Sequence, residues 1–282
     1  MSGAETRPGE EGFAGIATGA FRDLQARLCA AFEAFEPKSR FEARSWTKPA
    51  GHRLQGGGES RLMRGEVFEK VGVNVSHVWG VLPVESRGQV AGADASGGRF
   101  VACGISLVAH MSNPYVPAVH MNLRYLSTNR AWFGGGSDLT PTFPIAEDTG
   151  AFHAALRHAC DAYRPGAYKE YKEWCDRYFY LPHRQEPRGV GGVFFDDLAS
   201  GDASADFAFV RALGEALLEV YPQIVARRKD TPYDAEKREQ LLVKRGRYVE
   251  FNLVYDRGTR FGFSTDADPD AYLMSLPPLV KW

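Results

Sequence analysis

The sequence predicts an α+β fold in which a large antiparallel β-sheet is flanked by helices on both faces. Strand patterns follow one another in runs joined by turn signals, rather than alternating one by one with helices, and this order favours antiparallel pairing. The 282 residues, 44% of them hydrophobic, suffice for a sizeable core. Neither an internal repeat nor a low-complexity linker divides the chain, so we assign residues 13–282 to a single domain after a disordered lead-in at residues 1–12.

Helices are predicted where apolar residues recur at helical spacing. The first helix has Phe21, Leu24, Leu28 and Phe32 on one side, and a proline closes it soon afterwards. Asp268-Pro269 is a further helix start, with a capping carboxylate followed by a proline at the first position. The other predicted helices cover residues 147–163, 167–180, 205–228 and 235–244, and the first covers residues 15–35.

Strands are predicted where apolar and polar residues alternate. Between residues 100–110 and 119–126, Asn113-Pro114 and Pro117 are turn signals, so these two strands form a hairpin. The remaining predicted strands fall within residues 62–81, 192–195, 247–255 and 260–264, and residues 48–59 and 134–136 are expected to form glycine-rich loops.

Charge and targeting signals exclude several classes of protein. Lys and Arg number 34 against 35 Asp and Glu, so no basic field is available for nucleic acid or an anionic membrane surface. The four cysteines lack zinc-site spacing and fit a reducing compartment. The N-terminus has no apolar signal segment, and no apolar run approaches the ~20 residues that span a bilayer. We expect a cytoplasmic protein with no transmembrane segment and no nucleic-acid partner.

The hairpin carries a polar face. On its second strand His120, Asn122 and Arg124 alternate with apolar residues, and on its first strand Ser106 and His110 share a face. Pairing of the two strands brings both polar rows together if their register puts them on the same side. An ordinary solvent-facing row is the alternative. Serine, histidine, asparagine and arginine, however, are types that bind ligands and transfer protons, which favours a site.

Residues 132–141, WFGGGSDLTP, follow the hairpin. Three glycines let the backbone approach a ligand closely, and Asp138 could accept a hydrogen bond from a ligand N–H group. A phosphate loop is disfavoured, because Pro141 interrupts the helix start that such a loop needs. The alternative for Asp138 is a carboxylate that caps a turn.

Two further groups of residues raise the question of a site. Asp256-Arg257-Gly258-Thr259 is predicted to be a tight turn, and it is either a plain turn ion pair or a place where arginine clamps a carboxylate. Among the histidines, His153 on a helix and His183 in a loop join the two of the hairpin as possible metal ligands, although no close metal-binding motif is present. Structural or surface roles are the alternative.

The longest motifs resemble one family. In chain order they are GGGESRLMRGEVFEKVGVNVSHVWG, SLVAHMSNPYVPAVHMNLRYL, WFGGGSDLTP, YKEWCDRYFYLPHRQEPRGVGGVFFDDL, RGRYVEFNLVYDRGTRFG and LMSLPPLVKW. Together they resemble the aerobic, oxygen-dependent coproporphyrinogen III oxidases, from about Gly56 to Trp282. The resemblance implies that two propionates of coproporphyrinogen III are oxidatively decarboxylated by dioxygen to the vinyl groups of protoporphyrinogen IX in haem biosynthesis. It also implies a homodimer built on a flat antiparallel sheet.

The resemblance also implies roles for individual residues. His120 is expected to be the proton donor, Asp138 to accept pyrrole N–H groups, and Asp256 with Arg257 to form a second acid–base pair. Substrate contacts are expected from Ser106, Asn122, Leu123 and Arg124, and the positions sometimes proposed as metal ligands match His110, His120, His153 and His183. No cofactor is required by the chemistry, because an electron-rich porphyrinogen can reduce oxygen directly, and a divalent metal is the alternative.

The sequence departs from the family pattern at two places. After Thr265 the family usually has Gly-Gly-Arg or Gly-Ser-Arg, whereas this chain has Asp266-Ala267-Asp268, so an arginine for a propionate is missing. Arg260 is a candidate to replace it. The family also runs on beyond the position of Trp282. The departure at Asp266–Asp268 leaves open a non-catalytic tetrapyrrole-binding protein whose site has decayed. The histidines leave open a metal-dependent oxygenase.

Overall fold

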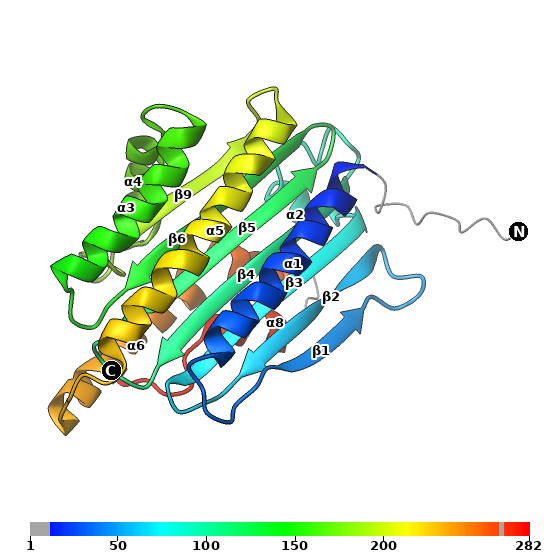
Figure 1. Cartoon of the computed structure of the whole chain (residues 1–282). Helices are drawn as coiled ribbons and strands as arrows, with labels where there is room; N and C mark the ends of the chain where they lie inside the picture. The colour runs from blue at the N-terminus through cyan, green and yellow to red at the C-terminus, as the bar shows by residue number, and fades with distance from the viewer. Residues whose placement is uncertain (1–11, 265–267) are drawn as a thin grey trace, which may run out of the picture.

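The computed structural model describes residues 12–264 and 268–282 and forms a single body (Figure 1). Its centre is a seven-stranded antiparallel sheet with the strand order β1-β2-β3-β4-β5-β6-β9. Apart from Gly12, the predicted lead-in lies outside the described residues. The strands are β1 Glu42–Thr47, β2 Leu54–Met63, β3 Phe68–Val81, β4 Arg99–Met111, β5 Ala118–Ser127, β6 Ala131–Thr140 and β9 Gly191–Leu198.

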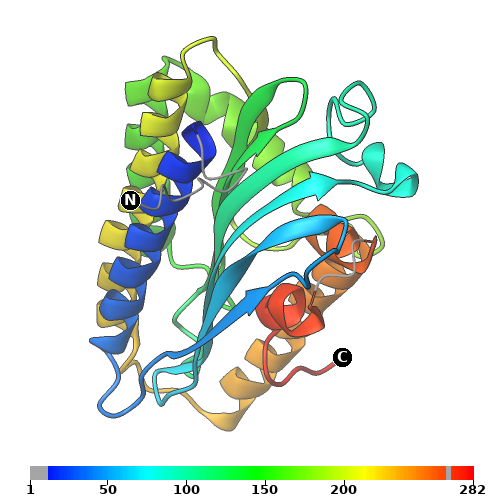
Figure 2. The same cartoon turned by 90° about the vertical axis from the view of Figure 1, so that its right-hand side faces the viewer.

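Helices cover both faces of the sheet, as the sequence predicted. Figure 2 views the sheet close to its edge, with the blue, green and yellow helices on one side and the orange and red ones on the other. The first layer consists of α1 Phe13–Glu33, α3 Ala146–Tyr163, α4 Ala167–Tyr178 and α5 Ala203–Arg228. The second consists of α6 Ala235–Val254, α7 Arg257–Ser264, α8 Pro269–Tyr272 and the short 3₁₀ helix η1 Leu273–Ser275. Two minor elements, α2 Val84–Arg87 and the ribbon of β7 Tyr180–Leu181 with β8 Glu186–Pro187, complete the chain.

Alternation along the central strands decides which layer forms the main core. Ile105, Leu107, Met121 and Leu123 are at most 1% exposed and belong to the large apolar cluster that contains α1 and α5. Phe133 of β6 stacks on Phe207 of α5 with ring centroids 5.7 Å apart. The opposite face of the same strands is therefore left for polar side chains.

The prediction of two strands near the C-terminus is wrong. Residues 247–255 continue helix α6, and residues 260–264 belong to α7. Alternation of apolar residues suggested strands there, but Tyr248, Phe251 and Asn252 are buried at helical spacing against the polar face of the sheet. A short apolar run does not by itself distinguish the two periods, and packing against the sheet decides in favour of the helix.

The prediction of glycine-rich loops is confirmed for residues 48–53, between β1 and β2, but is wrong for residues 54–59 and 134–136, which lie in strands. Residues 54–63 form β2, and residues 131–140 form β6 with all three glycines in the ladder. Glycine is unfavourable in an isolated strand, which explains the error, but here both strands are paired on each side. No helix in the described part of the chain is long and apolar enough to cross a membrane.

A buried carboxylate fixes the entry to β3. Glu36, just after α1, is 5% exposed, and its two oxygens accept hydrogen bonds from the backbone N–H groups of Glu66, Val67 and Phe68 at 2.8–2.9 Å. A carboxylate can accept several such bonds at once. Glu36 therefore ties the end of the first helix to the start of the longest strand.

We expect Glu36→Gln to lower the free energy of unfolding by about 1–3 kcal/mol, because the amide NH₂ group would face a backbone N–H donor. Denaturant unfolding measures the change. Glu42→Gln, on exposed β1, is the matched control and should leave the midpoint unchanged. Equal midpoints for the two variants would contradict the assigned role.

Candidate active site

One face of the sheet carries the polar side chains that the alternation predicted. β4 and β5 are paired so that Ser106 lies opposite Asn122 and Val108 lies opposite His120. β5 and β6 continue these rows, with Asp138 beside His120. The expected alignment of the two hairpin strands is confirmed, and the rows extend onto a third strand that had been predicted as a turn.

The C-terminal segment covers one end of this face. The side-chain amide of Asn74 donates to the carbonyl of Ala271 at 2.9 Å, and the His110 Nε2 group donates to the carbonyl of Ser275 at 2.9 Å. These bonds lay α8 and η1 over β3 and β4. The candidate site occupies the other end, over β5, β6 and β9.

A chain of three charged or ionisable side chains forms the centre of the site. Asp138 Oδ1 is 2.8 Å from His120 Nδ1, and Asp138 Oδ2 accepts a hydrogen bond from Arg188 Nη2 at 2.6 Å. Asp138 and Arg188 are each 1% exposed. Burial by itself would raise the pKa of the Asp138 carboxyl, but Arg188 and His120 outweigh it and hold that pKa below its ordinary value. Asp138 is therefore a carboxylate that can orient the imidazole of His120.

Arg188 lies in a cage of aromatic rings. Its guanidinium carbon is 4.0 Å from the centroid of Phe179, 4.5 Å from that of Tyr248 and 4.8 Å from that of Phe251. Its Nη1 group donates to the side-chain oxygen of Asn252 at 3.2 Å. The rings stabilise the cation and exclude water, so the Asp138–Arg188 pair acts at short range in a dry environment.

The geometry of Asp138 bears on its expected role. Both of its carboxylate oxygens are already bound by protein side chains, and the residue is sealed from solvent. In this arrangement the carboxylate acts on His120, and its contact with pyrrole N–H groups of a ligand stays a prediction. His120, whose side chain is 21% exposed, keeps its Nε2 atom on the ring edge away from Asp138 as the atom that can exchange a proton.

Two arginines flank a second carboxylate, Asp196 of β9. Arg124 Nη2 is 2.9 Å from Asp196 Oδ1, and Arg257 Nη2 is 3.2 Å from Asp196 Oδ2. Arg124 also donates from Nη1 to the side-chain oxygen of Asn122 at 2.9 Å. The structure thus brings the hairpin residues and Arg257 together, although they lie far apart in the sequence.

Asp256 and Arg257 start helix α7 and do not form a hairpin turn. Asp256 Oδ2 accepts a hydrogen bond from the backbone N–H of Thr259 at 2.7 Å, which is a helix cap. Asp256 Oδ1 accepts from the hydroxyl of Tyr178 at 3.0 Å, and this hydroxyl accepts from the Arg257 N–H at 3.1 Å. Burial, together with the charge of Asp256, raises the pKa of Tyr178, so the phenol stays protonated. Tyr178 therefore fixes the start of α7 against α4.

The four histidines proposed as metal ligands are not brought together. His110 lies under η1, and His153 of α3 bonds to the carbonyl of Val190 and the hydroxyl of Tyr168. Within the described residues, no group of three or more His, Cys, Asp or Glu is placed to hold a metal ion.

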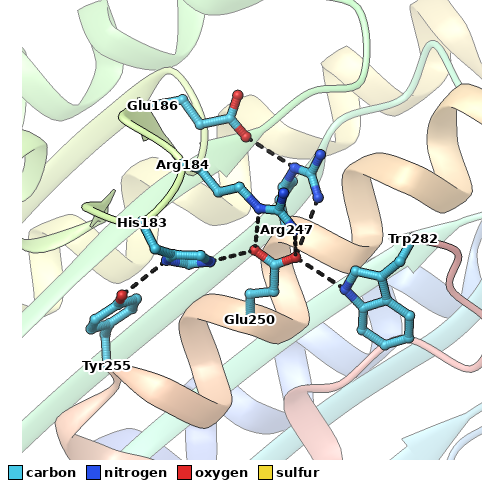
Figure 3. Close-up of polar contacts among 7 residues, drawn as sticks. All are labelled: His183, Arg184, Glu186, Arg247, Glu250, Tyr255 and Trp282. Carbon is cyan, nitrogen blue, oxygen red and sulfur yellow. Dashed lines mark hydrogen bonds and ion pairs between the residues drawn. The ribbon is translucent and has the colours of Figure 1, made fainter.

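His183 belongs to a separate cluster around Glu250 (Figure 3). Glu250 accepts hydrogen bonds from His183 at 2.7 Å, from Arg184 at 2.6 and 2.9 Å and from the indole of Trp282 at 3.0 Å. These bonds, those of Arg184 first, lower the pKa of Glu250 to about 2. The cluster connects the loop before β8, helix α6 and the C-terminal tryptophan, and it holds these three segments together.

The structure confirms Asp268 as the cap of a helix, whereas the substrate contacts expected of Leu123 and Arg260 stay predictions. The side chain of Leu123 is 0% exposed and points into the core on the opposite face, so it takes no part in the polar face. Asp266 and Ala267 lie outside the described residues, whereas Asp268 caps α8 and pairs with Arg44 at 3.1 Å. Arg260 is exposed on α7.

Arg188, Asp196 and Tyr178 were missed by the sequence analysis. A buried arginine has no sequence signal, because arginine is exposed in most proteins. Asp196 is the first polar residue after the apolar core of the run GGVFFDD, and this position was the one available indication.

A histidine oriented by a buried carboxylate, beside two arginines on a flat sheet face, defines an enzyme site for an acidic ligand. The family model described as coproporphyrinogen III oxidase matches residues 17–282. The chain is 50% identical to the oxygen-dependent coproporphyrinogen-III oxidase of Rickettsia bellii (strain OSU 85-389) over 271 residues, covering 93% of this chain and 95% of that protein. Identity to the protein of the same description from Rickettsia akari (strain Hartford) is 51%, with the same coverage. The chain belongs to the coproporphyrinogen III oxidase family.

We expect Asp138→Asn to destabilise the protein by about 3–5 kcal/mol, because Arg188 would stay charged and buried without a counter-charge. The double variant Asp138→Leu/Arg188→Met, which removes both charges, should recover most of this loss. Denaturant unfolding of the two variants and the wild type measures it. A double variant less stable than Asp138→Asn would show that the ion pair is not the source of the effect.

Proposed function

We propose that this chain catalyses the oxygen-dependent oxidative decarboxylation of coproporphyrinogen III, converting two propionates into the vinyl groups of protoporphyrinogen IX in haem biosynthesis. The observation that carries the proposal is the His120–Asp138–Arg188 chain beside Arg124 and Arg257 on one sheet face. The printed names of the relatives describe an oxygen-dependent oxidase of the same substrate.

The reaction balances without further reagents. Each propionic acid side chain loses one carbon dioxide and two hydrogens to become a vinyl group. The two electrons and two protons reduce one dioxygen to hydrogen peroxide, and two such rounds give the product. The protein's tasks are therefore to orient the macrocycle, to exclude water and to move protons.

The site residues divide these tasks between them. His120, oriented by Asp138, donates and accepts protons through Nε2. Arg124 and Arg257 bind propionate carboxylates, and Ser106 and Asn122 contact the substrate from neighbouring strands. Asp256 holds α7 and thereby Arg257 in place, working with Arg257 as one unit.

We further propose that dioxygen is the sole co-substrate and that no metal is required. The porphyrinogen supplies the electrons. His153 and His183 use both ring nitrogens in bonds to protein groups, so neither is available as a ligand without rearrangement. Metal analysis together with activity after chelation tests this, and activity that is lost on chelation and restored by a divalent cation would contradict it.

We propose a cytoplasmic homodimer. All four cysteines are buried free thiols, which fits a reducing compartment. Exposed apolar side chains gather on the C-terminal elements, where Leu253, Val254 and Phe263 are 43–57% exposed and Trp282 is 71% exposed. Such a group of exposed apolar residues is typical of a protein interface. Sedimentation analysis would measure the state in solution.

Anaerobic mixing of the protein with coproporphyrinogen III, followed by air, is expected to give the divinyl product only after oxygen enters. His120→Gln should reduce turnover by about 10²–10⁴-fold, because the proton-transferring group is lost. His158→Gln, exposed on α3 on the far side of the sheet, is the matched control. Absence of vinyl product from the wild type would reject the proposal in favour of a non-catalytic binding protein.

Arg257→Ala should lower kcat/KM by about 10–100-fold while the melting temperature stays unchanged. The side chain is 55% exposed, so its loss removes a carboxylate contact and little packing. Steady-state kinetics with thermal unfolding measure both quantities. Near-normal kinetics would contradict the assigned role.

A further inference from the structure

Asp196 lies between two arginines that come from different parts of the chain. Its Oδ1 atom is 2.9 Å from Arg124 Nη2 on strand β5, and its Oδ2 atom is 3.2 Å from Arg257 Nη2 on helix α7. Each oxygen of one carboxylate thus binds a different guanidinium. This arrangement joins the sheet half and the helix half of the site.

We propose that Asp196 is a positioning residue that holds Arg124 and Arg257 as one clamp for a single substrate carboxylate. The proposal rests on the proposed function and adds to it the element that aligns the two arginines. Two guanidiniums and one carboxylate leave one net positive charge, which matches one propionate. Without Asp196, the two cations would repel each other and separate.

Gly134 provides the floor on which this clamp lies. A Cβ atom at this position would lie 2.5 Å from Asp196 Oδ1 and 2.8 Å from Arg124 Nε and Nη2. Because real Cβ atoms do not make contacts this short, any other residue at this position would displace the ion pair from its place against β6. The first glycine of the GGG run therefore has a defined purpose, which differs from close approach to a phosphate.

The two arginines are held to different degrees. Arg124, with 28% of its side chain exposed, is bound at Nη1 by Asn122 and at Nη2 by Asp196. Arg257, with 55% exposed, lies above the stacked rings of Tyr178 and Phe194, at 5.3 and 5.6 Å from their centroids. Arg124 is consequently the fixed guanidinium of the clamp and Arg257 the adjustable one. Asp196 keeps Arg257 close to Arg124.

A purely structural role of Asp196 and the proposed positioning role differ in what they predict for stability and for kinetics. The side chains of Asp196 and Arg124 are 20% and 28% exposed and that of Arg257 is 55% exposed, so replacing Asp196 should lower the melting temperature only modestly. Replacing it does change the charge of the clamp from +1 to +2. A substrate carboxylate is then attracted at least as strongly but can move into the place of Asp196, away from its productive position. The signature is a fall in kcat without a rise in KM.

The test uses Asp196→Asn, which keeps the shape, and Asp196→Ala, which opens space for a small carboxylate. Asp197→Asn is the matched control, because it removes the same charge one residue away, where Asp197 forms a surface pair with Arg130 at 2.6 Å. We expect kcat to fall at least about tenfold in both Asp196 variants, with KM unchanged or lower. The control should stay within about twofold of the wild type, as expected for an exposed pair.

Chemical rescue provides the decisive measurement. Formate should raise kcat of Asp196→Ala in a saturable manner, since it can bind between the two guanidiniums, and should not raise that of Asp196→Asn. An Asp196→Asn variant within about twofold of wild-type kcat would overturn the proposal, as would an Asp196→Ala defect that formate does not restore.

A binding measurement separates the failure of this proposal from failure of the proposed function. Coproporphyrin III, the stable fluorescent tetracarboxylate, is titrated into each variant. Asp196→Asn is expected to bind it at least as tightly as the wild type, and Arg257→Ala at least about tenfold more weakly. If this binding pattern is observed but the wild type makes no vinyl product, the clamp proposal is supported and the proposed catalytic function is rejected. Several-fold weaker binding by Asp196→Asn would reject the clamp.

Discussion

The buried pair of Asp138 and Arg188 is the interaction on which the site depends. Transferring either charge alone into the interior would cost several kcal/mol, so each requires the other. The remaining surfaces of the guanidinium are occupied by Asn252 and three aromatic rings. Strand β6, the segment after β8 and helix α6 must therefore all be in place before the pair can form. Once formed, it fixes the carboxylate that is hydrogen-bonded to His120.

The two faces of the sheet have opposite construction. On the core face, branched and aromatic side chains interlock with α1 and α5. On the site face, cross-strand rows place glycines at positions 72, 104, 134, 136 and 192 among the polar residues. Rows poor in side chains make a flat surface, where a planar ligand can approach the backbone closely. Gly134 and Gly136, two of the three glycines that were predicted to form a turn, therefore contribute to the flat face of β6.

The sequence predicted the features of the fold that depend on local periodicity of apolar residues. The sheet class, the helices of the first layer and the polar face of the hairpin follow from alternation and helical spacing, which are dictated by backbone geometry. Patterns could not predict features decided by distant partners. Tyr248 and Phe251 are helical because they pack around Arg188, and Arg188 is buried because of Asp138, 50 residues earlier. Asp256 caps helix α7 instead of forming a hairpin turn, because residues 247–254 continue helix α6 and do not form the strand that such a turn would need.

The spacing along β5 limits the size of the ligand. His120 and Arg124 are four residues apart on one face of a strand, which separates their Cα atoms by about 13 Å. Asp138 is sealed and acts on His120, whereas Asp196 lies half-buried beside an exposed guanidinium and acts on whatever Arg257 binds. The proposed sites of proton transfer and carboxylate binding thus lie about 13 Å apart along β5, measured between Cα atoms. One ligand that contacts both residues has to extend over this distance less the reach of the two side chains, as a macrocycle with carboxylates on its rim does.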